Sequence, residues 1–238
     1  IRGGLILNRK LIQYSYEIQK QTQKKVWFVV IYVILLFIFI NLILDYVIFP
    51  VKQNSVSMLP DVPEQSYVMV SPLNKTYERG DIVLLKSRYS KPANKLQKLG
   101  VKFCAFFTGR RIFINENDES PSTKEKLRRI VGVPGDTIFM RDYVVYIKEK
   151  GQKHFLTEFE ITPKTYNVTF FVPPAGWNSS IGIKGTFEEI TLGEDEYFVL
   201  GDNRKSADDS RLWGKVSSKD IKAKALLCYY PFKSIKLY

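Results

Sequence analysis

Two serines, Ser55 and Ser57, lie two residues apart in the segment SVSMLPDVPEQ, residues 55–65. A serine hydroxyl becomes a good nucleophile when a neighbouring base takes its proton. The single histidine, His154, lies in a polar stretch far along the chain. A buried lysine is another common base, because burial lowers its pKa, and a serine–lysine pair needs no histidine. If Ser57 is a nucleophile, we expect a base other than histidine, although a serine-rich loop before a proline is more often only a turn.

Side chains that bind metals are scarce in this sequence. The chain has one histidine and two cysteines, Cys104 and Cys228. We therefore predict no metal site and no cofactor. The two cysteines could pair in an oxidising compartment, but their separation in sequence places no constraint on geometry. The sequence leaves this disulfide open.

A charge-free apolar run, Val26 to Leu44, follows a basic N-terminal arm. Its nineteen residues approach the ~20 that a helix needs to cross the hydrocarbon of a bilayer. The arm carries six basic residues against the single acid Glu17, and no zinc-finger or RNA-binding motif follows it. We therefore expect a phospholipid partner and no nucleic acid. The alternatives are a buried core helix and a cleavable signal peptide, and the second lacks its small-x-small exit in residues 45–50, DYVIFP.

These features divide the chain into three parts. We predict a basic cytoplasmic arm at residues 1–25, a transmembrane helix at 26–49 and an extracytoplasmic domain at 50–238. The positive charge of the arm keeps the N-terminus inside. The bulk of the protein is therefore expected to work on the far face of the membrane.

The part of the chain after Tyr67 has the pattern of a mainly β domain. Short alternating runs such as YVMV, DIVLLK, TIFM, YVVYIK and EYFVL are separated by Gly, Pro, Asn and Asp. At 238 residues and 45% hydrophobic, the chain is long enough for one main domain. Two stretches, about 86–123 and 150–192, interrupt the strand pattern and are predicted to be variable insertions. The expected architecture is a largely antiparallel β domain on one membrane helix.

Three further segments favour a catalytic role for Ser57 over a simple turn. They are RGDIV at residues 79–83, RRIVGVPGD at 128–136 and GDNRKSADDSRLWG at 201–214. In this order, after one membrane span and a Ser-x-Ser-Met-x-Pro segment, they closely resemble the bacterial type I signal peptidases, the leader peptidases of peptidase family S26. The resemblance covers about residues 20 to 235.

The resemblance implies a fold and an activity. The fold is an antiparallel, barrel-like, LexA-like catalytic domain, and the protein is a monomer in the cytoplasmic (inner) membrane with that domain on the periplasmic side. The activity is that of a serine endopeptidase, which cuts signal peptides from exported preproteins after small residues through an acyl-enzyme. Two alternatives stay open: an impaired homologue that binds preproteins without cleaving them, and a pilin-type processing protease of the same fold.

The resemblance also implies roles for individual residues. Ser57 matches the nucleophile, and the Ser55 hydroxyl with the Ser57 backbone N–H matches the oxyanion donors, worth ~3 kcal/mol each. Met58 falls where the family has an apolar side chain at the bilayer-facing rim. Two ion pairs are expected to support the site, and they are Arg129 with Asp202 and Asp209 with Arg211.

The sequence departs from the family at the general base. The family's lysine position is occupied by Arg128, and the serine that would hydrogen-bond this lysine is replaced by Ala207. Because its ordinary pKa lies far above neutral pH, an arginine would need roughly 7 kcal/mol to act as a base near pH 8. A smaller departure is Asp61, which replaces a threonine and is expected to alter local hydrogen bonding.

The sequence offers one substitute for the missing base. Lys126 lies two residues before Arg128, and side chains at i and i+2 of a strand share a face. Ser206 is likewise one position from Ala207. A bulge or a register shift could bring Lys126 to Ser57 as a substitute base. The alternative is that Lys126 is one more exposed lysine of the polar run KEKLRR.

Overall fold

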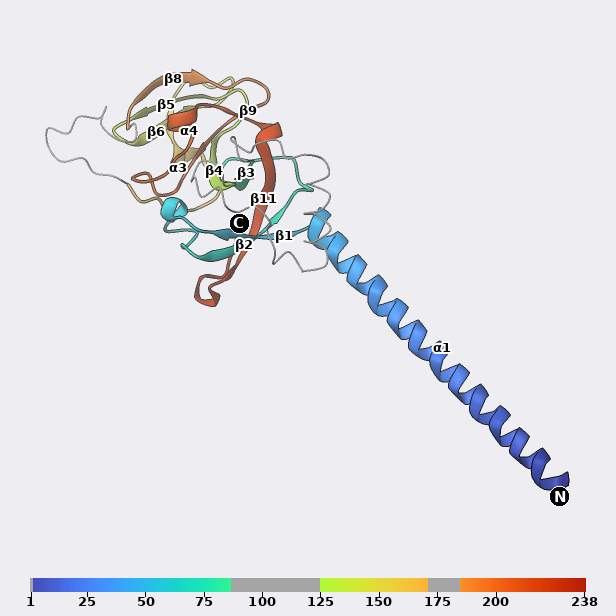
Figure 1. The fold of residues 1–238 in the computed structure, drawn as a ribbon. Coiled ribbons are helices and arrows are strands. Elements are labelled where there is room, and N and C mark those ends of the chain that lie inside the picture. Colours follow the sequence, from blue (N-terminus) through green and yellow to red (C-terminus); the bar gives the residue numbers. More distant parts are fainter. Residues whose placement is uncertain (1, 87–124, 171–184) are drawn as a thin grey trace. The chain divides into compact units, whose positions relative to one another are not determined.

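The computed structural model describes residues 2–86, 125–170 and 185–238 (Figure 1). The chain forms two compact units, Ile1–Asp45 and Tyr46–Tyr238. The first unit is almost wholly one α-helix, α1 (Arg2–Tyr46). The second is a β domain.

Helix α1 contains a segment long enough to cross a membrane. Gln19–Ile43 is 25 residues long, which corresponds to about 37 Å of helix against a hydrocarbon core of ~30 Å. Its apolar side chains are largely exposed, with Phe28 at 72%, unlike those of a core helix in a soluble protein. The predicted apolar helix is present, but its end differs from the prediction, because α1 stops at Tyr46 and Phe49 already belongs to a strand.

The β domain consists of two antiparallel sheets. The larger has the strand order β1-β2-β11-β3-β4-β9-β10 with β12 paired to β11, and the smaller has the order β7-β6-β5-β8. The strands of the larger sheet are β1 (Phe49–Gln53), β2 (Ser66–Ser71), β3 (Ile82–Leu85), β4 (Lys126–Gly132), β9 (Glu196–Leu200), β10 (Val216–Ser217), β11 (Ile221–Tyr230) and β12 (Lys236–Leu237). Those of the smaller sheet are β5 (Thr137–Arg141), β6 (Val144–Lys148), β7 (Leu156–Thr157) and β8 (Phe187–Thr191). The prediction of a mainly antiparallel β fold is confirmed.

Short helices connect these strands. They are α3 (Glu158–Ile161), α4 (Ser210–Trp213) and the 3-10 turns η1 (Val56–Met58), η2 (Ser218–Asp220) and η3 (Phe232–Ser234). Two of them matter for the site. The turn η1 carries Ser57, and α4 lies within the last of the four sequence segments, residues 201–214.

Strand β4 is buried on both faces, and this burial organises the domain. Every residue from Leu127 to Gly132 is buried. The strand pairs with β3 on one side, with Val83 opposite Arg128, and with β9 on the other. Since successive side chains point to opposite faces, Arg128 and Arg129 enter two different buried environments. One of these contains Ser57.

The stretch predicted as a variable insertion at 150–192 contributes to the buried interior. Its residues 171–184 lie outside the described part, as does nearly all of the 86–123 insertion, including Cys104. Glu158, at the start of α3, is 2% exposed and accepts two hydrogen bonds from the fully buried Arg204, at 2.8 and 2.5 Å. The Tyr166 hydroxyl donates to the same carboxylate at 2.9 Å. This part of the insertion is therefore joined to the core.

We expect Glu158→Ala to lower the free energy of unfolding by about 3–5 kcal/mol, because it leaves the Arg204 guanidinium buried without its carboxylate. Urea unfolding of the full chain in detergent measures this loss. The matched control is Glu188→Ala, which removes an exposed carboxylate of β8 and should change stability by less than about 0.5 kcal/mol. Equal effects of the two substitutions would contradict the importance of the buried pair.

Candidate active site

Ser57 lies on a turn that is held in place by Asn203. The Asn203 backbone N–H donates to the Ser57 carbonyl at 3.0 Å, and the Asn203 side-chain amide donates to the Val56 carbonyl at 3.1 Å. The turn η1 is closed by the Leu59 N–H, which donates to the Val56 carbonyl at 3.2 Å. The GDNR segment thus fixes the backbone on both sides of the candidate nucleophile.

Among the residues that the structure describes, three side chains contact the Ser57 hydroxyl. Arg128 Nη1 donates to Ser57 Oγ at 2.9 Å, and Gln53 Nε2 donates to it at 3.4 Å. The Ser55 and Ser57 hydroxyl oxygens are 2.9 Å apart. Ser57 is 3% exposed, whereas Ser55 is exposed. The structure therefore brings together three of the residues expected at this site, Ser55, Ser57 and Arg128.

The Arg128 guanidinium is fixed by carbonyl oxygens. Its Nε and Nη2 donate to the Asp208 carbonyl at 2.8 and 2.5 Å, and Nη1 also donates to the Leu127 carbonyl at 2.5 Å. Burial lowers the pKa of Arg128, and the nearby charges of Asp209 and Asp208 oppose this change. Because a protonated guanidinium has no acceptor, Arg128 meets Ser57 only as a hydrogen-bond donor.

Lys126 makes a different contact from the one that a substitute base needs. Its Nζ forms an ion pair with the Asp208 carboxylate and lies 5.8 Å from the centre of the Trp213 ring. The Trp213 indole N–H donates to the same carboxylate. Burial would raise the pKa of Asp208, but the hydrogen bonds from Lys126 and Trp213 outweigh it and lower this pKa. The contacts of Lys126 therefore lead to Asp208, and none described leads to Ser57.

The Ala207 position is tightly packed and offers no hydroxyl. Ala207 is fully buried, and Ser206 beside it is exposed. A Cβ atom added to Gly201 would lie 2.2 Å from the Ala207 Cβ and 2.6 Å from the Ser57 carbonyl oxygen. At Gly201 the chain therefore passes so close to the Ser57 turn that any side chain at this position must displace the turn.

Arg129 occupies the opposite face of β4 in a cluster of ions. It donates to both carboxylate oxygens of Asp202, at 2.7 and 2.6 Å, and to Asp61 at 2.8 Å. The hydrogen bonds and charge of Asp202 outweigh the effect of burial and raise the pKa of Arg129. Lys236 Nζ donates to the second oxygen of Asp61 at 2.7 Å, so the aspartate joins the C-terminal strand to this cluster.

Asp209 and Arg211 form a second buried pair beside the site. Arg211 donates to the Asp209 carboxylate at 2.9 and 2.8 Å, and the same carboxylate accepts from the Gly201 N–H at 3.0 Å. Asp209 is also the N-cap of α4. These contacts orient the backbone next to Ser57 rather than touch its hydroxyl.

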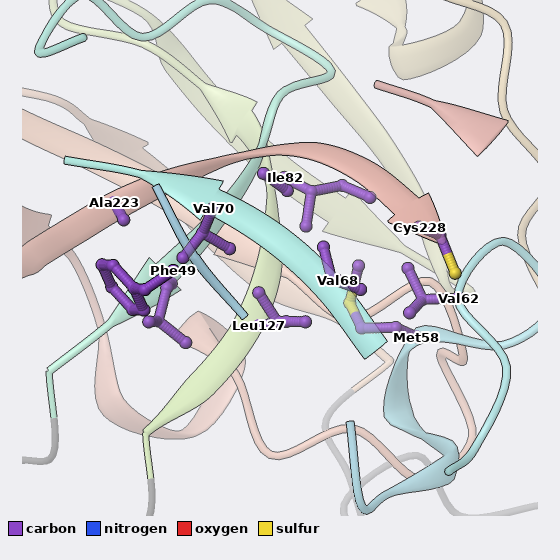
Figure 2. Close-up of a cluster of buried hydrophobic side chains, with 11 residues drawn as sticks. Phe49, Met58, Val62, Val68, Val70, Ile82, Leu127, Ala223 and Cys228 are labelled. Atoms are coloured by element: carbon purple, nitrogen blue, oxygen red, sulfur yellow. The ribbon is translucent and has the colours of Figure 1, made fainter. Parts of the chain in front are cut away.

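Met58 does not lie at an exposed rim as predicted. Figure 2 shows its side chain among those of Val62, Val68 and Cys228, and it is 0% exposed in this apolar cluster. The turn η1 directs Met58 into the core, where it anchors the loop that carries Ser57. Met58 is therefore a core residue of the described structure.

Sequence reasoning missed two residues that contact the site. Gln53 ends β1, 5% exposed, and its amide also donates to the Ser55 carbonyl and hydroxyl at 2.9 and 3.2 Å. Strand alternation from the buried Phe49 would have placed Gln53 on the inner face. No comparable signal in the sequence pointed to Asp208. Its carbonyl accepts from Arg128 and its carboxylate pairs with Lys126, and both are contacts between segments far apart in the chain.

Comparisons with known proteins give one family. The family model "Signal peptidase, peptidase S26" matches residues 24–230. A signal peptidase I of Bacillus licheniformis is 28% identical over 140 residues, 57% of this chain and 66% of that protein. Signal peptidase I U of Bacillus subtilis (strain 168) is 31% identical over 120 residues, 50% of this chain and 57% of that protein. The chain thus spans less than two thirds of the length of these two relatives. A crystal structure of a signal peptidase I from Enterococcus faecalis V583 is 20% identical with a TM-score of 0.31, covering 63% of this chain and 96% of that one.

We expect Gly201→Ala to displace the Ser57 turn, because the new Cβ meets a backbone oxygen that has no freedom to move alone. The loss of stability should be about 1–3 kcal/mol. Amide hydrogen exchange should also become faster at Asn203, whose N–H donates to Ser57. Gly193→Ala is the control, since its Cβ would first meet the flexible Glu196 side chain, at 3.1 Å. Unchanged exchange at Asn203 would refute the tight contact.

Proposed function

The chain belongs to the signal peptidase family, peptidase S26, and from that premise we propose that it is a membrane-anchored serine endopeptidase that removes signal peptides from exported preproteins. Helix α1 is the anchor, with its basic arm in the cytoplasm and the β domain on the outer side of the cytoplasmic membrane. A signal peptide and the phospholipid bilayer are then its partners.

One observation carries this proposal: the buried Ser57 hydroxyl lies 2.9 Å from the Arg128 guanidinium on a rigidly held turn. A cation at this distance stabilises the serine alkoxide relative to the alcohol. The proton leaves on the side of the exposed Ser55, whose hydroxyl is 2.9 Å away, and passes to solvent. Arg128 then acts as a fixed positive charge, and no side chain is required to act as the base.

The chemistry follows from these positions. Ser57 Oγ bonds to the scissile carbonyl carbon, and the carbonyl oxygen becomes an oxyanion that accepts from the Ser55 hydroxyl and the Ser57 N–H. Collapse of this intermediate breaks the C–N bond, and the leaving amine takes a proton from water. A second water then hydrolyses the ester and returns the hydroxyl to Ser57. The products are a mature protein and a signal peptide with a free carboxylate.

A second candidate function is binding of signal peptides without turnover. It is favoured by the contacts of Ser57 within the described part of the chain, where no side-chain base lies next to it, Arg128 and Gln53 both donate and Lys126 is paired with Asp208. A peptide could still add as an extended strand to the domain. Cleavage itself separates the two candidates.

We expect the purified chain in detergent and lipid to cleave a model preprotein at a rate that rises about tenfold per pH unit between about pH 6 and 10. The rate follows the fraction of Ser57 that is an alkoxide, and this fraction rises about tenfold per pH unit below the pKa of the serine. Ser57→Ala should abolish cleavage, and Arg128→Met should lower it about 10²-fold, because the cation is lost. Lys126→Met should stay within about twofold, because its amine is engaged by Asp208.

The outcomes of this series differ sharply. A dead Lys126→Met variant with a rate plateau at neutral pH would identify Lys126 as the base and contradict the role given to Arg128. A parent protein that binds signal peptide at every pH but never cuts it would favour the second candidate.

We further expect the double substitution Arg128→Lys with Ala207→Ser to raise the rate at neutral pH by about 10²–10⁴-fold, the usual contribution of a general base. A lysine amine releases its proton in a buried site, whereas a guanidinium does not. The single Arg128→Lys variant is the matched control for the added hydroxyl. A double variant that is no faster than the parent, with an unchanged melting temperature, would show that the missing base is not the only obstacle to cleavage at this site.

A further inference from the structure

Arg128 differs from the other buried arginines in its partners. The described part of the chain contains five buried arginines, and four of them contact a carboxylate. The four ion pairs are Arg79–Asp136, Arg129–Asp202, Arg204–Glu158 and Arg211–Asp209. Arg128 is equally buried, with 3% of the residue exposed, but among these described arginines it alone has no carboxylate within ion-pair distance. Within residues 2–86, 125–170 and 185–238, its hydrogen bonds go to one hydroxyl and to carbonyl oxygens.

The carboxylates nearest in sequence are committed elsewhere. That of Asp208 is held by Lys126 and the Trp213 indole, although the Asp208 carbonyl accepts from Arg128. That of Asp209 is held by Arg211 and the Gly201 N–H. A buried cation with no carboxylate in contact is costly, so a site of this kind favours an anion.

The groups around Ser57 Oγ are arranged to receive such an anion. Arg128 Nη1 and Gln53 Nε2 both point at this oxygen, and the Ser55 hydroxyl lies 2.9 Å from it. Gln53 is itself 5% exposed, so its amide is a fixed donor rather than a mobile surface group. Arginine and amide donors match the two acceptor oxygens of a carboxylate. The exposed Ser55 marks the side that solvent reaches.

We propose that Arg128, Gln53 and Ser55 form a binding site for the free α-carboxylate of a peptide, the group that cleavage would leave on the signal peptide. This inference rests on the proposed function for the identity of the peptide. The acyl carbon is bonded to Ser57 Oγ before hydrolysis, and Arg128 Nη1 lies 2.9 Å from Ser57 Oγ. Hydrolysis therefore releases the carboxylate next to the Arg128 guanidinium. The arginine that takes the place of the base therefore gives the site an affinity for its own product, and release of the cleaved signal peptide becomes slow.

The experiment compares two synthetic signal peptides that end at the cleavage position in alanine, one as the free acid and one as the amide. Both are titrated into the full-length Ser57→Ala variant in detergent and lipid, where no covalent step occurs, and Kd is measured by fluorescence anisotropy. We expect the acid to bind at least about tenfold more tightly than the amide. Ser57→Ala leaves the Arg128 donor in place.

A second substitution in the same background locates the charge that is responsible. Arg128→Met should bring the ratio of the two Kd values close to one, and Arg128→Lys should restore part of the preference at low pH, where the lysine amine is protonated. Arg141→Met removes an exposed arginine of β5 and should leave the ratio unchanged. Near-UV circular dichroism of each variant shows whether the fold is retained, and the Arg128→Lys result keeps the test decisive if Arg128→Met does not fold.

The outcomes separate this inference from the proposed function. Equal binding of acid and amide overturns the carboxylate site and leaves the peptidase proposal standing. Preference for the acid by a parent protein that never cleaves supports the carboxylate site and refutes the peptidase proposal. Failure of both peptides to bind overturns both.

Discussion

Burial of positive charge is the constraint on which this domain depends. Strand β4 places two consecutive arginines inside the protein, Arg128 on one face and Arg129 on the other. An arginine cannot be made neutral in such a place, so its donors have to be met by acceptors from elsewhere in the chain. For Arg129 these acceptors include Asp61 and Asp202, which come from the loop after Ser57 and from the segment after β9. Satisfying one side chain thus brings three distant segments together.

The same constraint explains how the turn at Ser57 stays in place. Asp202 pairs with Arg129, and its neighbour Asn203 holds the backbone of Val56 and Ser57. Two residues further from Asp202, Arg204 is buried against Glu158. A short run of polar residues therefore links β4, the turn η1 and the α3 region. Buried ion pairs contribute little net stability, but breaking one is costly, which makes this arrangement specific.

The sequence predicted the architecture and the members of the site better than their contacts. Alternating runs indicated an antiparallel β domain, and the resemblance to the signal peptidases assigned Ser57, Arg128 and the last segment to one site. It did not predict that Glu158 is buried, because a polar stretch with turn residues has the same pattern whether it is a surface loop or not. The family resemblance placed Met58 at the bilayer-facing rim, whereas its side chain packs in the core of the domain. Residues that act through carbonyl oxygens, as Asp208 does, leave no mark on the side-chain pattern.

The two departures at the site have a common physical basis. A lysine amine has three donors and suits one hydroxyl partner, whereas a guanidinium has five and needs several acceptors in its plane. Here the Asp208 carbonyl accepts twice from Arg128, and the adjacent Ala207 adds only a methyl group to a fully buried position. The Asp208 carboxylate meanwhile neutralises Lys126, which removes a second positive charge from the surroundings of Arg128. The arginine, the alanine and the aspartate therefore form one consistent arrangement, in which a guanidinium held by carbonyl oxygens lies beside the Ser57 hydroxyl.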